Sequence, residues 1–305
     1  MKYQGIKQGF PNLKRISSKF SSYASLCRPY TILGAFLAGL FLDILFSRLS
    51  VNGLHLFHSI LVGITLALLQ SGGQILNQSI QEEVEIDILN GKTYRPVVNG
   101  SISLLEGQIL SSLMFIGGVS LAFCLNFNYG IFSLLIAFFA IFYTVPPLRM
   151  KKRFLLNNLW QGIARGLLPA VYVSSAYPSF GFLPVLFGVV IAIWVSGFQA
   201  SKDFNDLDGD SKFNIKTFPV VLGKEGALKL MSVFGLISFC VLNLFVALKA
   251  FPTSFLLLNV LAVPTILILV GLKRNIRVGF AENNIAWVGF YGTLGCFYMI
   301  PALII

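Results

Sequence analysis

Two short acidic segments hold eight of the twelve Asp and Glu residues in this sequence. Glu83 and Asp87 lie four residues apart in the first segment, and Asp206 and Asp210 do so in the second. On a helix this spacing puts both carboxylates on one face, where they repel unless a cation lies between them. Carboxylates without nearby histidine or cysteine favour Mg²⁺, which proteins usually hold together with substrate phosphates. A solvated helix end paired with lysines is the alternative.

The two acidic segments also repeat one another. A shift of 123 residues aligns Glu83 with Asp206, and it aligns the Pro-Val-Val run that begins at Pro96 with the run that begins at Pro219. An internal repeat of this kind predicts two related halves with a shared site between them.

Basic residues accompany these carboxylates. Arg95 and Lys216 follow the two acidic segments, and Lys202 begins the second one. A third basic run, from Tyr143 to Arg153, ends an apolar stretch. Lys and Arg around a diphosphate that Mg²⁺ bridges to carboxylates would prepare that diphosphate to depart as a leaving group.

The composition predicts a membrane protein. Of 305 residues, 56% are hydrophobic and only 11% are charged, whereas soluble domains carry about 25% charged residues. The net charge of +11 does not indicate a nucleic-acid partner, because the 23 Lys and Arg lie in short clusters between apolar runs. The four cysteines lie far apart and predict core residues rather than disulfides or zinc ligands.

Nine apolar runs are long enough to cross a bilayer as helices. They predict an all-α integral membrane protein, a bundle of nine transmembrane helices in two pseudo-repeated halves. The positive-inside rule puts the N-terminus, both acidic segments and hence the active site on the cytoplasmic side of a cell or organelle membrane. The nine runs are residues 30–46, 54–76, 107–125, 130–148, 155–175, 182–200, 226–249, 253–271 and 285–305.

The sequence predicts two parts of unequal size. Residues 1–29 are basic, and their apolar residues have helical spacing, which predicts an amphipathic helix on the membrane surface; a disordered basic tail is the alternative. Residues 30–305 form the nine-helix membrane domain.

These motifs resemble those of the UbiA superfamily of intramembrane polyprenyl transferases. The run from Lys202 to Asp210, with the Lys-Thr-Phe-Pro that begins at Lys216, is similar to the family's KDxxDxxGDxxxxxKTxP stretch. The run from Tyr143 to Lys151 is similar to its YSxPPxRxK segment. The resemblance extends over nearly the whole chain and includes nine spans with acidic motifs after spans 2 and 6.

The first acidic motif departs from the family pattern, which has Asn followed by Asp four and eight residues later. Counting from Asn77 gives Gln81 and Glu85, whereas counting back from Asp87 gives Glu83. A two-residue insertion after Asn77, with a local bulge in the helix, would reconcile the two registers.

The resemblance implies transfer of a polyprenyl group from a prenyl diphosphate to a lipophilic acceptor, with Mg²⁺ as cofactor. The acceptor would be an aromatic quinone precursor, a chlorophyllide-like molecule or a prenylated glycerol phosphate. Asp87, Glu83, Asp206 and Asp210 would hold the metal and, with Lys151 and Lys202, form the catalytic set, while Asn77, Arg95, Tyr143, Arg149, Lys216 and Arg165 would bind substrate.

Two charged residues inside the apolar runs need separate explanations. Arg165 is the one strong cation within a span, and intramembrane charge is costly and usually functional. It could bind an acidic acceptor, or it could pair with a helix carbonyl or extend to the interface. Asp43, near the outer end of the first span, is expected to reach interfacial water.

Three other functions compete with prenyl transfer. CDP-alcohol phosphotransferases also use repeated aspartates with Mg²⁺ at a membrane face, but Asp208-Gly209-Asp210 is not followed by the rest of their signature. The pseudo-repeat and Arg165 would suit a secondary transporter, although transporters keep their charged site near the bilayer midplane. The altered first motif would suit a family member that acts only as a scaffold.

Overall fold

The structure is a computed structural model that describes residues 13–49, 55–177, 181–279 and 284–305. Every regular element in these ranges is helical. The α-helices are α1 (Leu13–Cys27), α2 (Pro29–Leu49), α3 (Leu56–Gln78), α4 (Gln81–Leu89), α5 (Leu104–Leu125), α6 (Phe127–Thr144), α7 (Leu156–Gly162), α8 (Leu168–Ser174), α9 (Leu183–Phe198), α10 (Leu207–Lys212), α11 (Phe218–Ala247), α12 (Ala262–Lys273) and α13 (Ile285–Ile304). Shorter turns are η1 (Met150–Lys152), the π-helical η2 (Ile163–Leu167), η4 (Gln199–Asn205) and η5 (Thr253–Leu261).

Eight helices in the described part of the chain are long and apolar enough to cross a membrane. Two of them join a 3₁₀ turn to an α-helix, Leu183–Asn205 from α9 and η4, and Thr253–Lys273 from η5 and α12. The chain is therefore an all-helical, multi-pass membrane protein, as its composition predicts. Helices suit this solvent because they satisfy their own backbone hydrogen bonds.

The remaining predicted span, residues 155–175, is divided into three successive helical pieces. These are α7, the π-helical turn η2 and α8, which follow one another without a loop. Two glycines let this segment approach α9 very closely: a β-carbon on Gly166 would lie 2.4 Å from the backbone nitrogen of Ala192, and one on Gly162 would lie 2.1 Å from Ser196 Oγ. Larger residues at either glycine would push the two segments apart.

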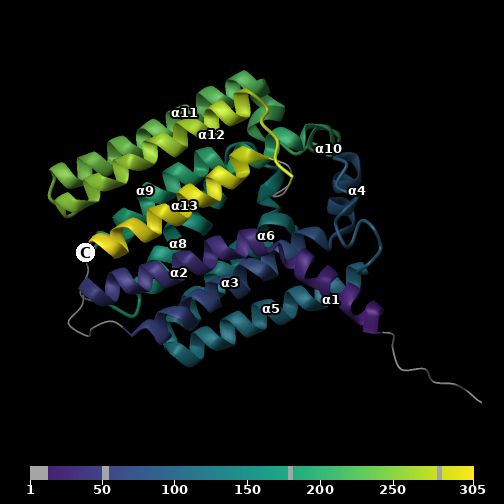
Figure 1. Cartoon of the computed structure of the whole chain (residues 1–305), viewed down its shortest axis with the longest axis horizontal. Helices are drawn as coiled ribbons and strands as arrows, with labels where there is room; N and C mark the ends of the chain where they lie inside the picture. Colours follow the sequence, from purple (N-terminus) through teal and green to yellow (C-terminus); the bar gives the residue numbers. More distant parts are fainter. Residues whose placement is uncertain (1–12, 50–54, 178–180, 280–283) are drawn as a thin grey trace, which may run out of the picture.

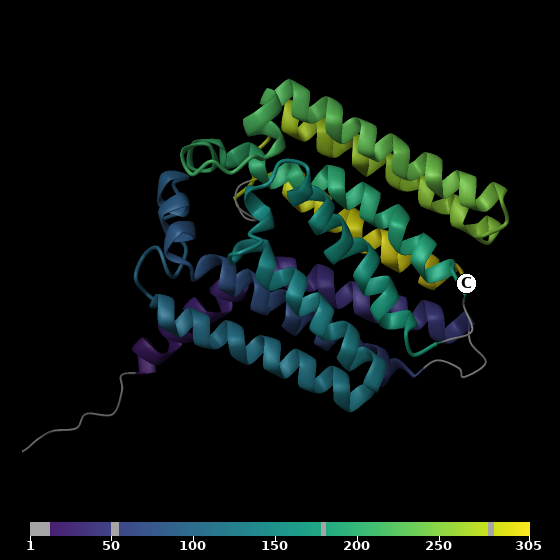
Figure 2. The same cartoon turned by 180° about the vertical axis from the view of Figure 1, so that it is seen from behind.

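The long helices lie roughly side by side in one bundle (Figures 1 and 2). Helix α3 packs against both α2 and α5, α13 packs against α2 and α12, and α11 packs against α9. The short helices α4 and α10 lie together beyond one end of the bundle, and the C-terminus lies at the opposite end (Figure 1). The two acidic segments are therefore brought to the same end of the molecule.

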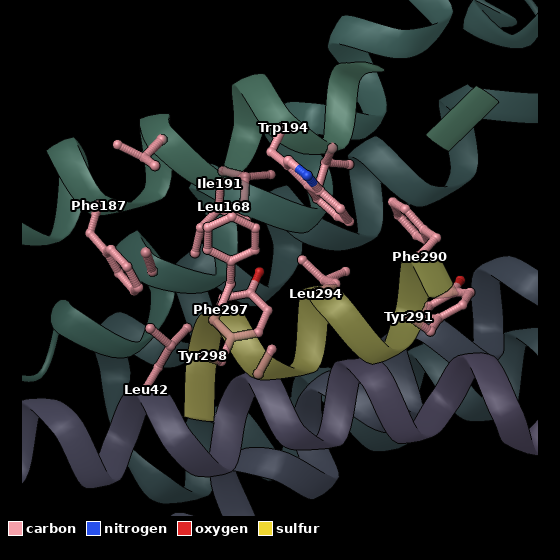
Figure 3. Close-up of a cluster of buried hydrophobic side chains, with 14 of the residues drawn as sticks. Leu42, Leu168, Phe187, Ile191, Trp194, Phe290, Tyr291, Leu294, Phe297 and Tyr298 are labelled. Carbon is pink, nitrogen blue, oxygen red and sulfur yellow. The ribbon is translucent and has the colours of Figure 1, made fainter. Parts of the chain in front are cut away.

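Aromatic side chains fill the interface between α9 and α13. The rings of Phe198, Trp194, Phe290 and Trp287 stack nearly parallel, with successive centroids 5.0, 5.4 and 5.0 Å apart. Figure 3 shows the α9 side chains facing those of α13 across this interface. The buried indole of Trp194 donates to Thr265 Oγ1 at 3.0 Å, which satisfies its only polar group. This packing fixes α13 beside the segment that contains Arg165.

A buried carboxylate ties four segments together near the other end of the bundle. Asp43 in α2 is 1% exposed and is hydrogen bonded to His58 (3.0 Å), Ser59 (2.7 Å), Tyr129 (3.2 Å) and Tyr177 (2.8 Å). The prediction that Asp43 reaches interfacial water is thus wrong. Hydrogen-bond donors from α3, α6 and the segment after α8 satisfy the carboxylate instead. They offset the high cost of burying its charge.

This network makes Asp43 a large contributor to stability. Replacing Asp43 with Ala is expected to lower the free energy of unfolding by about 3 kcal/mol, because four polar partners lose their acceptor. The apparent melting temperature of the detergent-solubilised protein should fall accordingly. His55→Ala, at an exposed residue beside the start of α3, serves as the control. An equal melting temperature for both variants would contradict this account.

Candidate active site

A break in the chain after α3 sets the register of the first acidic motif. Helix α3 ends at Gln78 and α4 begins at Gln81, so the chain has a helix break here instead of the predicted local bulge. In α4, Glu83 (2% exposed) and Asp87 are buried, whereas Gln81 and Glu85 are exposed and hydrogen bond to each other at 3.0 Å. The structure therefore selects Glu83 and Asp87 as the inward-facing pair.

Close packing of α4 against α10 brings the two acidic segments together. The backbone nitrogen of Gly209 donates to Asn90 Oδ1 at 2.8 Å. A β-carbon on Gly209 would lie 2.7 Å from the Asn90 amide and 2.8 Å from the carbonyl oxygen of Ile86. Glycine at this position in the second motif therefore permits the contact.

Each inward-facing carboxylate is paired with a basic residue. Arg95 donates to Asp87, and Lys151 donates to Glu83. Lys92 Nζ lies 2.6 Å from Asp206 Oδ1 and so links the loop after α4 to the second acidic segment.

Lys202 Nζ lies 2.9 Å from Asp203 Oδ1, one residue further along η4. The four pairs form a compact cluster of both charges at one end of the bundle, where an anion and a divalent cation could enter together.

The loop between α6 and α7 closes this cluster from the side. Arg149 Nη1 donates to Glu82 Oε2 at 2.6 Å, and Lys152 Nζ lies 2.7 Å from Glu82 Oε1. Burial alone would raise the pKa of Glu82, but these two cations lower it below its ordinary value.

Lys151 stays charged although it is buried. Burial alone would lower the pKa of Lys151, but the Glu83 and Asp210 carboxylates raise it above its ordinary value.

A single cavity connects the charged cluster to the apolar interior. It encloses about 1260 Å³ of space, partly open to solvent, and its apolar walls come from α2, α3, α6 and α13. Nine of the twelve predicted site residues line it: Glu83, Asp87, Asp206, Lys151, Lys202, Asn77, Arg95, Tyr143 and Arg165.

The other three predicted site residues lie outside the lining. Asp210 is buried, and burial raises the pKa of this carboxyl to about 7, although Lys151 opposes the shift. Arg149 donates to Glu82 and its Nη2 lies 3.7 Å from Glu83 Oε1, and Lys216 is exposed.

Several polar residues of the cavity were not among the predicted site residues. Gln70 and Gln74 lie on the same face of α3 as the predicted residue Asn77, and all three line the cavity. Gln74 Oε1 accepts from Arg28 at 2.9 Å, and Asn77 Nδ2 donates to Thr144 at 3.2 Å. The sequence did contain a signal for them: side-chain amides at 70, 74 and 77 recur with helical spacing in an otherwise apolar helix, which predicts a polar stripe on one face. Lys92, Gln161 and Gln199 also line the cavity.

The donor set fits a hard divalent cation shared with phosphate. Among the described residues, no group of three His, Cys, Asp or Glu side chains converges to hold a metal ion unaided. However, Mg²⁺ needs only one or two carboxylates when phosphate oxygens complete its shell. The buried Glu83 Oε1 accepts no hydrogen bond from the described residues, and its nearest cation is Arg149 Nη2, 3.7 Å away. The Glu83 side chain lines the cavity, so this oxygen could also bind a cation there.

A charged cluster at the mouth of an apolar cavity, in a multi-pass helical membrane protein, is the arrangement expected of an intramembrane enzyme with an amphipathic substrate. The chain matches the family model described as the UbiA prenyltransferase family over residues 29–293. It therefore belongs to the UbiA prenyltransferase family, and it is a prenyltransferase. The match favours this prediction over the CDP-alcohol phosphotransferase and transporter alternatives.

Relatives and solved structures agree with this assignment. The digeranylgeranylglyceryl phosphate synthase of Saccharolobus solfataricus is 30% identical over 209 residues, which cover 66% of this chain and 69% of that protein. The homogentisate phytyltransferase of a Synechocystis strain is 27% identical over 66% of this chain and 68% of its own length. The structure of a UbiA homologue from Archaeoglobus fulgidus, bound to GPP and Mg²⁺, has a TM-score of 0.68 at 18% identity and covers 93% of this chain and 98% of its own. That structural likeness concerns the fold.

Proposed function

We propose that this chain transfers a polyprenyl group from a prenyl diphosphate to a lipophilic acceptor, and that Glu83, Asp87, Asp206 and Asp210 hold Mg²⁺ for this reaction. The observation that carries the proposal is the cluster of paired carboxylates and cations at the mouth of an apolar cavity. The charged end matches a metal-bound diphosphate, and the apolar walls match a prenyl chain. The homologue from Archaeoglobus fulgidus, solved with GPP and Mg²⁺, supports the same pairing of ligands.

The chain's own residues have distinct tasks in this reaction. When bound, Mg²⁺ would neutralise the diphosphate and make it a better leaving group. Lys151, Lys202 and Arg95 line the cavity and would stabilise the charge that develops as the diphosphate departs. Asn77 and Tyr143, also in the lining, would orient the substrate. Arg149 and Lys216 would act from outside the lining, by holding the loop and attracting the anion.

Prenyl transfer breaks one bond at C1 of the prenyl chain and forms another. The bond between C1 of the prenyl chain and its diphosphate oxygen breaks, and both electrons leave on the oxygen. A new bond forms between C1 and a nucleophilic carbon or oxygen of the acceptor, which gives one proton to the departing diphosphate. Aromatic rings such as Phe139, Trp287 and Tyr291 in the cavity wall would stabilise positive charge on the allylic carbon.

We further propose nine membrane crossings, with the α7–η2–α8 segment as the fifth. Twenty of the 23 Lys and Arg then lie on the side of the N-terminus, which supports a cytoplasmic N-terminus and a cytoplasmic active site. The adjacency of α4 and α10 supports two pseudo-repeated halves. Residues 1–29 would form a basic surface segment: α1 is a helix, Lys19 pairs with Glu106 at 2.5 Å, and residues 1–12 lie outside the described residues.

Incubation of the full chain in membranes with labelled geranylgeranyl diphosphate tests the proposal. The acceptors are hydroxybenzoate, dihydroxynaphthoate, homogentisate, chlorophyllide and a prenylated glycerol phosphate, each with and without Mg²⁺. Mg²⁺-dependent labelled product from one of these acceptors is expected. A folded protein that forms no product and binds no prenyl diphosphate would refute the proposal.

Metal binding should depend on pH through Asp210. Burial raises the pKa of this carboxyl to about 7, and a carboxyl group must lose its proton before it binds a cation. Affinity for Mg²⁺ is therefore expected to rise as pH increases from 6 to 8, with release of a proton on binding. Calorimetric titrations in two buffers of different ionisation enthalpy measure that proton. Asp210→Asn should abolish its release, and unchanged proton release in this variant would contradict the prediction.

A further inference from the structure

The guanidinium of Arg165 lies in the wall of the cavity, and the residue belongs to the proposed fifth membrane crossing. It lies nine residues after the start of α7, which corresponds to about 13 Å along a helix axis. The predicted alternative of pairing with a helix carbonyl is not found among the described residues. Nη1 of Arg165 instead donates to the hydroxyl of Tyr291. Arg48, by contrast, does donate to a helix carbonyl, that of Ala302, at 2.9 Å.

The position of Arg165 is fixed by contacts on its backbone and on its side chain. Its carbonyl oxygen accepts from Tyr298, and its guanidinium carbon lies 5.6 Å from the centre of the Tyr291 ring. Tyr291 is in turn packed edge-on against Tyr30 and Trp287, with ring centroids 5.2 and 4.8 Å apart. The guanidinium is therefore preorganised, so that little entropy is lost when a ligand binds.

The charge of Arg165 has no acidic partner in the described part of the chain. The carboxylates at the cavity mouth pair with Lys92, Arg95, Lys151 and Lys202, and none lies within ion-pair distance of Arg165. A cation in a low-dielectric interior is costly unless something balances it. The hydroxyl of Tyr291 is its only described hydrogen-bond acceptor, which leaves other guanidinium N–H groups to meet a ligand in the cavity.

A second polar atom in the same cavity also lacks a partner. Gln199 is 2% exposed and lines the cavity, and its Oε1 accepts no hydrogen bond from the described residues. A buried acceptor of this kind calls for a donor from the ligand. The cavity thus offers a cation for an anionic group and an amide oxygen for a hydroxyl group.

We propose that Arg165, positioned by Tyr291, binds an anionic oxygen group on the prenyl acceptor, so that this enzyme uses acidic acceptors and rejects their neutral analogues. The inference rests on the proposed prenyl transfer and names the class of acceptor for it. The diphosphate is neutralised by the cations at the cavity mouth, which leaves Arg165 for the second substrate. A guanidinium can bind either a carboxylate or a phosphate group. The experiment below shows which of these two groups the acceptor carries.

The test compares acids with matched neutral acceptors, with geranylgeranyl diphosphate as donor. Hydroxybenzoate and homogentisate are compared with their methyl esters, and geranylgeranylglyceryl phosphate with geranylgeranylglycerol. The wild type should use an acid at least 30-fold more efficiently than its neutral partner. In Arg165→Gln the KM for that acid should rise at least 30-fold while the KM for the donor changes less than twofold. Arg165→Lys should restore part of the loss, and Arg48→Gln should behave as the wild type.

Either of two results would overturn the inference: equal use of acid and neutral acceptors by the wild type, or a donor KM that rises in Arg165→Gln as much as the acceptor KM. If no acceptor turns over, quenching of the protein's tryptophan fluorescence, to which Trp287 in the cavity wall contributes, measures acceptor binding. Preferential binding of an acid that is lost in Arg165→Gln supports the inference, and equal binding of acid and ester refutes it. Failure of the wild type to bind donor with Mg²⁺ would instead refute the proposed function.

Discussion

Replacement of Asp206 by Asn is expected to lower prenyl transfer by at least about 100-fold, the usual cost of removing one group that stabilises charge in a transition state. Asp206 lines the cavity and pairs with Lys92 at 2.6 Å. Asparagine has nearly the same size and removes only the negative charge. The rate should therefore fall while the protein stays folded, because the metal-bound diphosphate loses one of its anchors.

Asp208→Asn provides a matched control two residues away. Asp208 belongs to the same acidic motif, but its side chain is exposed and it does not line the cavity. Its substitution should change the rate less than twofold. Initial rates with labelled donor at saturating and limiting Mg²⁺ measure both variants. Equal losses in the two variants would mean that the second motif contributes only its overall charge.

Glu83→Gln is expected to have an effect of similar size, at least about 100-fold on the rate. Glu83 accepts from Lys151 and has a second oxygen without a hydrogen-bond partner among the described residues. Its substitution removes one proposed metal ligand and also leaves Lys151 without its partner. The expected result includes a higher Mg²⁺ concentration for half-maximal activity, because glutamine binds the cation more weakly than a carboxylate.

Glu85→Gln distinguishes the two registers of the altered first motif. The count from Asn77 would make Glu85 a ligand, whereas the helix break after α3 leaves it exposed and bonded to Gln81. Activity and Mg²⁺ dependence of Glu85→Gln should therefore match the wild type. A large loss in Glu85→Gln with an active Glu83→Gln would reverse the register and contradict the described arrangement.

The helical membrane architecture could be predicted because long apolar runs have few alternatives in a bilayer. The predicted and observed spans agree to within a few residues for most helices. Helix α11 begins earlier than predicted, at Phe218 instead of residue 226. However, it contains a residue with non-helical backbone angles, Gly223, shortly before the predicted start. The acidic motifs were predictable for a different reason: their charge is concentrated in two segments. Local sequence could not decide the register of the first motif, because the deciding feature is a helix break stabilised by packing of α4 against α10.

Tertiary partners explain the residues whose environment was mispredicted or missed. Asp43 has the sequence position of an interfacial residue, yet partners from α3, α6 and the segment after α8 enclose it. Gln199 is separated from Asn77 and Arg165 along the chain, and only the bundle brings all three to one cavity. No local pattern encodes such convergence.

We propose that both acidic segments hold one metal-bound diphosphate. A crystal structure of the protein with Mn²⁺ and a non-hydrolysable prenyl thiodiphosphate tests it most directly, because Mn²⁺ gives an anomalous signal at an oxygen site suited to Mg²⁺. We expect anomalous density in contact with carboxylates of both segments, Glu83 or Asp87 on one side and Asp206 or Asp210 on the other, with the prenyl chain in the apolar cavity. Density held by one segment alone, or a diphosphate bound away from the cavity mouth, would contradict it.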